Sequence, residues 1–302
     1  MGQPLVYVVI VNWNRWDDTI ACVASVLNAN YTNLTVLVVD NHSTADGGDE
    51  LRERFPEVEV IYNPANVGFA GGANLGIVQA LADGADYVFT LNNDAIVDRA
   101  SVAALVAVAE QHRGVGIVGP TIYYLDPPDR VWFAGANRNR WTLSLGHGKS
   151  KQIGLAFDRP HEVSYLCAGA MLVRREIFEQ VGLFDAGYFM YYEDCDFCIR
   201  VIEQGYGLRH APKAKVWHKV AASTGGEGSP LEIYYRTWSV FRFLAQHARG
   251  MHRVGLIVLR VGYVLLKTAY LWVRGRHKVA RFSWMGLRDG LASMPDSVVR
   301  RR

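Results

Sequence analysis

The segment YVFTLNNDAIV, at residues 87–97, contains the central strand of the predicted fold. Its first five residues are apolar or β-branched, a composition typical of a strand buried on both faces of a sheet. The chain then becomes polar at once, with Asn92, Asn93 and Asp94. Open α/β sheets bind ligands at the carboxyl ends of their strands, and a carboxylate beside amide oxygens suits Mg²⁺ or Mn²⁺ bridging to a phosphate. The alternative is that these residues only begin a turn.

Two more buried strands precede this stretch, LVYVVIV at residues 5–11 and LTVLVV at residues 34–39. A helix with an apolar face is expected between them, over residues 17–28, and a shorter strand after them, over residues 58–62. Strands and helices that alternate in this way predict a parallel, doubly wound sheet. Asp40, at the tip of the second strand, is then either a turn residue or a ligand to a ribose or base.

The segment NVGFAGGANLG, at residues 66–76, opens a helix that we expect to reach Ala82. Glycines at a helix start allow a phosphate to approach the free backbone N–H groups. The segment is neither a GxGxxG fingerprint nor a Walker loop. A helix packed tightly on its neighbours would explain the same glycines equally well.

Further along, the sequence predicts a helix that starts at Asp98 and runs through Glu110, then a strand over residues 115–119 that ends at Pro120. Another strand is predicted over residues 165–173, with small residues in its middle. Those small residues either leave space for a sugar or permit close packing.

Three acids crowd the start of one predicted helix, in the segment YFMYYEDCDFCIR at residues 188–200. They are Glu193, Asp194 and Asp196. One explanation is electrostatic, since an acid at a helix N-terminus stabilises the helix by about 0.3–1 kcal/mol. The other is that a carboxylate whose pKa is raised by crowding and burial acts as a general base.

His218 and the cysteines are the remaining candidate metal ligands. A lone His is usually structural, but His218 ends a strand-like piece and is a candidate second ligand for an ion at Asp94. Cys195 and Cys198 form a CxxC pair without a second pair to match it, which argues against a zinc site and for reduced structural thiols in a cytosolic compartment. The N-terminus has no basic segment and only a short apolar run, so we expect a strand there and not a signal peptide.

Taken together, these motifs resemble glycosyltransferase family 2, a family of inverting enzymes with the GT-A fold, over residues 4–228. The resemblance implies an α/β fold with a doubly wound, mostly parallel sheet that has a nucleotide-binding half and an acceptor half. We expect this catalytic domain to occupy residues 1–235 and a helical tail to occupy residues 236–302. By the same resemblance, the donor nucleotide is bound by Asn12, Trp13, Asn14, Asp40, Asn41, Asn66, Gly68, Gly71, Asn74, Asn92 and Asn93.

The resemblance also assigns chemical roles. Asp94 ends a variant of the family's DXD motif and, with His218, would hold Mg²⁺ or Mn²⁺, which offsets charge on the leaving diphosphate. Asp194 is the expected base, and Glu193 is expected to assist it. The expected acceptor-side residues are Gly169, Asp196 and Trp217.

The motifs NNDxxV, YxEDxDxxxR and WHKxxxSTGG are most similar to those of bacterial rhamnosyltransferases. This similarity implies transfer of L-rhamnose from dTDP-L-rhamnose to a lipid-linked or polysaccharide acceptor in cell-envelope glycan synthesis. The alternatives are a transferase that uses a UDP- or GDP-hexose, a nucleotidyltransferase, and a non-catalytic nucleotide-sugar binder on the same fold.

The last part of the chain differs in charge from the rest. From Arg236 onward there are 14 Lys and Arg against 2 Asp and Glu, a net charge of +12, whereas the remainder carries −9 and the whole chain +3. Residues 254–273 are strongly apolar, but Arg260 and Lys267 interrupt them. Each such charge at a bilayer centre costs about 2.5–3.5 kcal/mol, so we do not expect a transmembrane helix.

Basic residues in this tail recur at spacings of seven or four, which return to one side of a helix. They are Arg242, Arg249, Arg253, Arg260, Lys267 and Arg274. We expect an amphipathic anchor that binds an anionic membrane surface, even if Gly250 and Gly255 break the segment into two helices. The enzyme would then be cytoplasmic and peripheral on the inner face of the cell membrane, with no nucleic-acid partner. The alternative is a helix packed on the catalytic domain with its basic stripe in solvent.

Overall fold

The structure, a computed structural model, describes residues 2–139, 141–146, 159–220 and 225–294. It divides into two compact units, and the second comprises residues 141–143, 187–192 and everything from Val220 onward. The predicted boundary after residue 235 falls inside a helix of the second unit. That helix begins earlier, where Ser229 accepts a hydrogen bond from the backbone N–H of Glu232 and Pro230 occupies the first turn.

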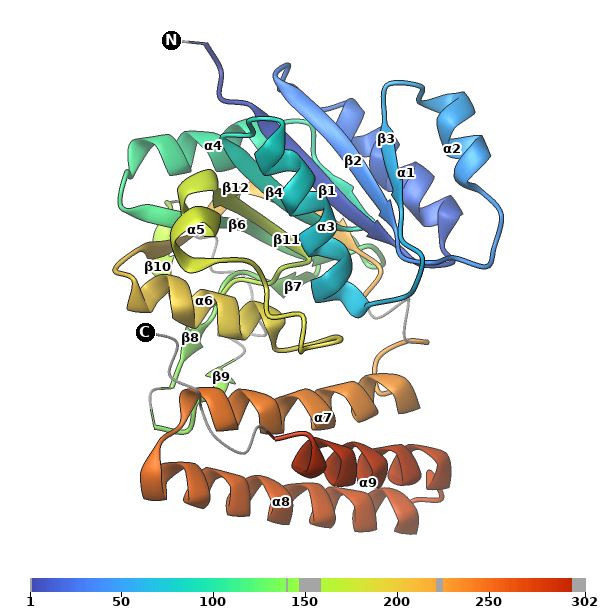
Figure 1. Cartoon of the computed structure of the whole chain (residues 1–302), viewed down its shortest axis with the longest axis vertical. Helices are drawn as coiled ribbons and strands as arrows, with labels where there is room; N and C mark the ends of the chain where they lie inside the picture. The colour runs from blue at the N-terminus through green and yellow to red at the C-terminus, as the bar shows by residue number, and fades with distance from the viewer. Residues whose placement is uncertain (1, 140, 147–158, 221–224, 295–302) are drawn as a thin grey trace. The chain divides into compact units, whose positions relative to one another are not determined.

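The first unit is built on a ten-stranded sheet (Figure 1). Its strands are β1 (Val6–Asn12), β2 (Leu34–Asp40), β3 (Glu59–Tyr62), β4 (Tyr87–Asn92), β5 (Ala95–Val97), β6 (Val115–Tyr124), β7 (Val131–Phe133), β10 (His161–Val163), β11 (Ala170–Arg174) and β12 (Gly207–His218). Their order is β10-β12-β6-β11-β4-β1-β2-β3, with β5 paired to β12 and β7 to β6. A separate two-stranded sheet pairs β8 (Asn137–Arg138) with β9 (Leu145–Gly146).

The nucleotide-binding half that was predicted from the sequence corresponds to the parallel run β4-β1-β2-β3. Its central strands are buried on both faces, as their apolar sequences predict, and Val8, Leu37 and Phe89 have no exposed surface. In the other half, β11 runs antiparallel to β4 and β6, whereas β12 is parallel to β6. The expected α/β fold with a doubly wound, mostly parallel sheet is confirmed.

Helices flank this sheet (Figure 1). They are α1 (Trp16–Leu27), α2 (Gly48–Arg54), α3 (Gly68–Ala82), α4 (Ser101–Gln111), α5 (Arg175–Val181) and α6 (Glu193–Glu203). Two glycines of α3 support close helix packing, one of the two explanations that the sequence left open. A Cβ at Gly76 would lie 2.5 Å from Val9, and one at Gly72 would lie 2.9 Å from Val11. These two glycines therefore allow α3 to pack closely on β1.

Three predicted boundaries in this unit are wrong. The helix expected from Asp98 begins at Ser101, and the Asp98 side chain accepts the N–H of Ala100 instead. The strand expected to end at Pro120 continues to Tyr124, because its partner β12 is irregular beside Pro120 and does not require a donor there. The strand expected from residue 165 begins only at Ala170.

The second unit contains three helices among its described residues, α7 (Pro230–His247), α8 (Gly250–Val273) and α9 (His277–Ala292). Gly250, with a φ of 54°, separates α7 from α8, whereas Gly255 lies inside α8 and does not break it. Leu271 of α8 packs with Val279 and Ala280 of α9. Within the described part of the chain, α8 is the one helix long and apolar enough to cross a membrane by length and composition.

Candidate active site

The end of β12 meets the start of β5 at the carboxyl edge of the sheet. Because the two strands are antiparallel, with Ala95 opposite His218, the residue before Ala95 is brought against the histidine. Oδ1 of Asp94 lies 2.9 Å from Nε2 of His218, and both side chains are buried. Nδ2 of Asn92 lies 3.1 Å from the same histidine nitrogen.

The spacing of this pair fits a divalent cation. Two ligands in adjacent positions of an octahedral Mg²⁺ or Mn²⁺ site, each about 2.1 Å from the ion, lie about 3.0 Å apart. The observed separation of 2.9 Å between Asp94 Oδ1 and His218 Nε2 matches that value. Among the described residues there is no group of three or more His, Cys, Asp or Glu that could hold a metal. Within the described residues, the structure thus brings two candidate metal ligands together here, a carboxylate oxygen and an imidazole nitrogen.

Polar residues at the ends of β1, β2 and β4 form one hydrogen-bonded network. Asn12 donates through Nδ2 to Asp40 Oδ1 at 3.0 Å and accepts through Oδ1 from Asn93 Nδ2 at 3.2 Å. Thr19 Oγ1 donates to the same Asn12 oxygen at 2.9 Å, and Ser43 packs its hydroxyl against Asn12 and Asp40. This network fixes the predicted donor-binding residues relative to the metal-binding edge.

A second cluster shapes the loop that leads into α3. The buried Asn41 donates to Asn66 Oδ1 and to the Gly68 carbonyl, both at 3.0 Å, and accepts from the N–H of Val67. Gly68 has a φ of 75°, a conformation that glycine adopts without strain. Asn41, Asn66 and Gly68 therefore shape the loop next to the donor network.

The loop after β1 is organised in the same way. Asn14 has a φ of 56°, and its Oδ1 accepts from the N–H groups of Thr44 and Ala45. Trp13 precedes it and is 37% exposed. An exposed indole at this edge offers a stacking surface for a nucleotide base.

Two of the predicted donor-binding residues have other partners. Asn74 donates to the Phe184 carbonyl at 2.9 Å and accepts from the Phe184 N–H at 3.1 Å, so it ties α3 to the loop before residue 186. A Cβ at Gly71 would lie 2.6 Å from Val67, which makes Gly71 a residue of local packing. The structure does not bring Asn74 or Gly71 into the donor network.

The acids at the start of α6 are buried in a separate cluster, in which hydrogen bonds hold Asp194. Asp194 Oδ2 accepts from the Tyr165 hydroxyl at 2.8 Å and from the N–H of Ala168 at 3.3 Å, and Oδ1 accepts from the N–H of Cys195. Burial raises the pKa of Asp194, and these hydrogen bonds oppose that rise. A carboxylate held in this way has one defined orientation and an elevated proton affinity.

Glu193 and the cysteines share this buried environment. Burial and the neighbouring charge of Asp194 raise the pKa of Glu193 well above its ordinary value, and Oε2 of Glu193 has no hydrogen-bond partner among the described residues. Cys195 and Cys198 are free and buried, in agreement with the prediction of reduced structural thiols.

The segment Ala168–Gly169 connects the acid pocket to the metal-binding edge. Ala168 binds Asp194 through its N–H, while the Gly169 carbonyl accepts the N–H of Asn92 at 2.9 Å. A Cβ at Gly169 would lie 2.8 Å from Asn92 Nδ2, the atom that contacts His218. Gly169 thus allows close packing of Asn92, which supports the packing alternative at this position.

Two residues predicted on the acceptor side have partners within the protein. Asp196 forms an ion pair with Arg200 at 2.8 Å, and Arg200 also donates to the carbonyls of Val181 and Leu183. Trp217 stacks on Tyr123 with ring centroids 5.9 Å apart, and its indole donates to the Pro128 carbonyl. Because neighbouring residues on a strand point to opposite faces, Trp217 faces away from His218.

Sequence reasoning missed four residues of this site. Tyr165 orients Asp194, and Thr19 and Ser43 complete the donor network. Lys219 forms an ion pair with Asp18, which also pairs with Arg15. The lysine follows His218 directly in the WHK motif, which was the one available signal for it.

Solved structures with this fold support the architecture. A mannosyltransferase of Pyrobaculum calidifontis, solved with GDP-Man and Mn²⁺, superposes with a TM-score of 0.61 at 13% identity and covers 96% of this chain and 88% of its own. GalNAc-T7, solved with UDP, GalNAc and Mn²⁺, gives a TM-score of 0.60 at 18% identity over 71% of this chain and 43% of its own. Both are GT-A glycosyltransferases, and at these identities the likeness establishes the fold alone.

Sequence relatives extend over nearly the whole chain. An N-acetylglucosaminyl-diphospho-decaprenol L-rhamnosyltransferase of Mycobacterium tuberculosis (strain CDC 1551 / Oshkosh) is 29% identical over 94% of this chain and 97% of its own. A dTDP-rhamnosyl transferase, RfbF, of Shigella flexneri is 24% identical over 91% of this chain and 90% of its own. The family model described as Glycosyl transferase family 2 matches residues 7–182, more than half of the chain. The chain is therefore a glycosyltransferase, similar to bacterial rhamnosyltransferases, and it belongs to glycosyl transferase family 2.

Proposed function

We propose that this glycosyltransferase transfers L-rhamnose from dTDP-L-rhamnose to a lipid-linked acceptor in cell-envelope glycan synthesis, with inversion at the anomeric carbon. The observation that carries the proposal is the link through Ala168–Gly169 between Asp194 and the Asp94–His218 pair. It fixes a buried base relative to a metal-binding edge, as a displacement with one base and one leaving group requires. The choice of donor and acceptor is supported by the names of the two relatives.

The donor end of the site would bind the nucleotide diphosphate. Asp94 and His218 would hold Mg²⁺ or Mn²⁺, which supplies positive charge to the departing diphosphate when it is bound. Asn12, Asp40 and the exposed Trp13 are arranged to hold the nucleoside. The two-residue ligand set supports this assignment, because it leaves several coordination positions for phosphate oxygens.

Asp194 would serve as the base on the acceptor side. Its carboxylate would take the proton of the acceptor hydroxyl while that oxygen forms the new bond to the anomeric carbon. The bond from that carbon to the diphosphate oxygen breaks in the same step, from the opposite face, so the configuration inverts. Tyr165 and the N–H of Ala168 hold the carboxylate in place during proton transfer.

The test is a transfer assay with the purified full chain, Mn²⁺ and a prenyl-diphosphate-linked N-acetylglucosamine, offered dTDP-β-L-rhamnose, UDP-hexoses or GDP-hexoses. We expect release of dTDP from the rhamnose donor and an α-L-rhamnoside in the NMR spectrum of the product. Turnover with UDP- or GDP-hexoses alone would discard rhamnose as the donor sugar. A retained anomeric configuration would discard the mechanism, and release of pyrophosphate would indicate a nucleotidyltransferase.

We also propose that the second unit holds the enzyme on the inner face of the cell membrane. The support is α8, whose exposed side chains are mainly apolar, such as Leu259 and Val273. The helix would lie in the membrane surface and not cross it. It packs along α9, which has the exposed residues Lys278, Arg281 and Arg288. If α8 crossed the membrane, these three charges would enter the bilayer with it, at a cost of about 2.5–3.5 kcal/mol each.

The orientation of α8 differs from the one expected from the sequence. The basic residues Arg253, Arg260 and Lys267 are half-buried within the second unit, and apolar side chains occupy the exposed side. The sequence led us to expect that the basic side of this helix would face an anionic membrane, whereas the side left exposed in the second unit is apolar. An exposed apolar side is the geometry that burial in a membrane interface requires.

A further inference from the structure

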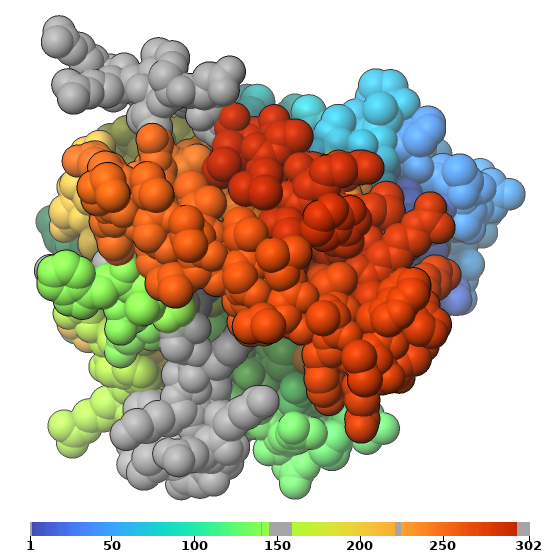
Figure 2. All heavy atoms as spheres, turned by 90° about the horizontal axis from the view of Figure 1, so that it is seen from below, coloured from blue at the N-terminus to red at the C-terminus, as the bar shows by residue number. Residues whose placement is uncertain are grey.

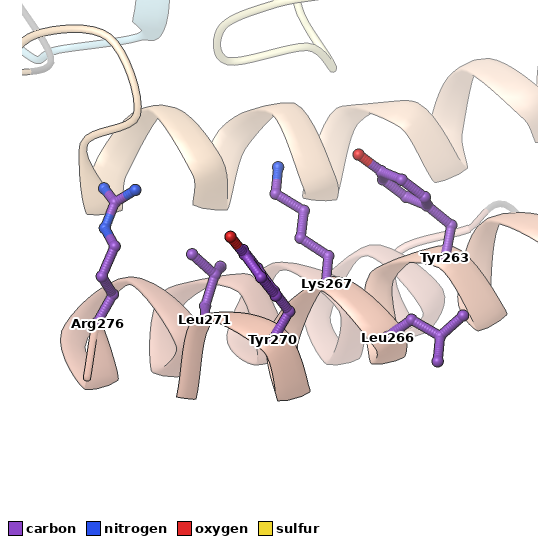
Figure 3. Close-up of a pocket in the computed structure, with 6 residues that line it drawn as sticks. All are labelled: Tyr263, Leu266, Lys267, Tyr270, Leu271 and Arg276. Atoms are coloured by element: carbon purple, nitrogen blue, oxygen red, sulfur yellow. The ribbon is translucent and has the colours of Figure 1, made fainter. Parts of the chain in front are cut away.

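A groove runs along α8 where it turns into α9, with a volume of about 510 Å³. Its walls are formed by Tyr263, Leu266, Lys267, Tyr270, Leu271 and Arg276. Figure 3 shows that Lys267, Tyr270 and Arg276 extend to the same side of α8. The groove therefore combines apolar walls with two cations and two phenol groups.

Among the described residues of the second unit, no acid forms an ion pair with Lys267 or Arg276. Residues 250–273 include no Asp or Glu, and Lys267 forms no ion pair with any described residue. Arg276 donates from one guanidinium nitrogen to the Gly228 carbonyl at 2.9 Å, a neutral partner. Two acids flank that contact: Glu232 is engaged by Arg236 and by the N–H of Gly228, and Glu227, next to Gly228, is exposed and forms no ion pair with Arg276. The groove is thus complementary to an anion.

The groove also opens onto the exposed apolar side of α8. Leu266 lines the groove and is 75% exposed, and Leu259, one helical heptad earlier, is 71% exposed. Val273, which follows Leu266 by seven residues, is 85% exposed. These three side chains lie on one side of the helix, which forms part of the surface of α8 and α9 in Figure 2. A ligand with both a charged head and a long apolar part matches this arrangement.

We propose that the groove binds the phosphate headgroup of an anionic membrane phospholipid, whose acyl chains lie along the exposed side of α8. The inference rests on the proposed membrane association and gives it a chemical specificity. Lys267 and Arg276 pair with the phosphate, and the hydroxyl of Tyr270 donates a hydrogen bond to it. Long basic side chains next to an apolar helix side lie at headgroup depth when the helix lies in the interface. A free phosphate would leave Leu266 and Leu271 without a partner, so the lipid is the better fit.

The test compares two doubly substituted full-length proteins that lose the same charge. One carries Lys267→Gln and Arg276→Gln in the groove, and the other carries Arg281→Gln and Arg288→Gln on the exposed side of α9. Affinity is measured by co-sedimentation with vesicles of pure phosphatidylcholine and of phosphatidylcholine with phosphatidylglycerol. We expect the groove variant to lose about 30-fold in affinity for the anionic vesicles, and the α9 variant to lose less than about fivefold. Equal losses would indicate diffuse attraction and overturn the headgroup site.

Two further measurements separate this inference from the proposed function. Transfer to a water-soluble acceptor with a short prenyl chain should be unchanged in the groove variant, because neither residue belongs to the active site. A thermal shift of the wild-type protein should appear with short-chain phosphatidylglycerol and be absent in the groove variant. An equal thermal shift with inorganic phosphate would overturn the lipid assignment. A stable dimer of the wild-type protein that the substitution Leu259→Ser dissociates would also overturn it, because the exposed side of α8 would then bind a second copy of the chain. Absence of transfer activity in the wild type would refute the proposed function and leave the vesicle result intact.

Discussion

The substitution Gly169→Ala tests whether the segment Ala168–Gly169 aligns the two halves of the active site. A Cβ at Gly169 would lie 2.8 Å from Nδ2 and 3.1 Å from Cγ of Asn92, closer than non-bonded atoms approach. The backbone there is held by two hydrogen bonds: the Gly169 carbonyl accepts from the N–H of Asn92, and the N–H of Ala168 donates to the carboxylate of Asp194. The amide of Asn92 is therefore the part that must move, and it moves away from His218.

The expected effect on catalysis exceeds the effect on stability. Loss of the single Asn92–His218 contact costs about 1 kcal/mol of folding free energy, which corresponds to a few degrees in Tm at most. A displacement of about 1 Å beside the reacting groups can lower turnover by about 10²-fold. We therefore expect kcat/KM to fall by about 10- to 100-fold while the protein stays folded. The loss should be larger at low Mn²⁺ concentration, because Asn92 contacts His218, the proposed metal ligand.

The assay is release of dTDP from dTDP-L-rhamnose across a Mn²⁺ titration, with Tm measured in parallel. Gly114→Ala is the matched control, since nothing lies within 4 Å of a Cβ built at that position. Wild-type kcat/KM and an unchanged Mn²⁺ dependence in Gly169→Ala would refute the reasoning.

Three more substitutions probe separate parts of the account. Asp94→Ala should abolish the Mn²⁺-dependent part of dTDP affinity in calorimetry without unfolding the chain; unchanged affinity would remove Asp94 from the metal site. Tyr165→Phe removes a hydrogen bond that lowers the pKa of Asp194, so that pKa rises further. Activity needs the deprotonated base, so when the pH is lowered the variant should lose activity at a higher pH than the wild type does. The control Tyr206→Phe should leave the acid side of the pH profile unchanged. Coincident pH profiles of Tyr165→Phe and the wild type would contradict this role. Gly76→Ala overfills the contact between α3 and β1 and should lower the free energy of unfolding by about 1–3 kcal/mol, which corresponds to a Tm lower by about 2–12 °C. An unchanged Tm would show that the helix can shift freely.

The sheet was predictable from the sequence because its central strands are buried on both faces. Such strands are continuous apolar runs, and β1, β2 and β4 end within one residue of where the sequence becomes polar. The strand that contains Pro120 was not predictable in the same way. Its continuation depends on an irregularity in β12, which lies about 90 residues further along the chain.

The site was predictable where residues end strands of the same sheet. Asp94 and His218 meet because β5 pairs with β12, and the resemblance had already assigned both to the metal. The role of Asn74 was not predictable, since its partner Phe184 lies 110 residues away. The ion pair of Asp196 could have been predicted from the sequence, because Arg200 follows it at the i+4 spacing that favours a helical ion pair.

The orientation of α8 could not be read from spacing alone. The periodicity of its basic residues shows that they share one side of the helix, but it does not say which side meets protein. In the structure Lys267 lies in the groove of the second unit, and the adjacent apolar side of the helix, with Leu259, Leu266 and Val273, is left exposed. Packing against α7 and α9, and not the amphipathic pattern, decides this orientation.

The central claim is that Asp194 is the base of an active site whose donor end is the Asp94–His218 pair. The most direct test is Asp194→Asn, which keeps the size of the side chain and its hydrogen bond from Tyr165 but removes the proton acceptor. Single-turnover kinetics should show transfer slowed by about 10²- to 10⁴-fold, with calorimetric affinity for dTDP and Mn²⁺ unchanged. Transfer at the wild-type rate in this variant would contradict the account.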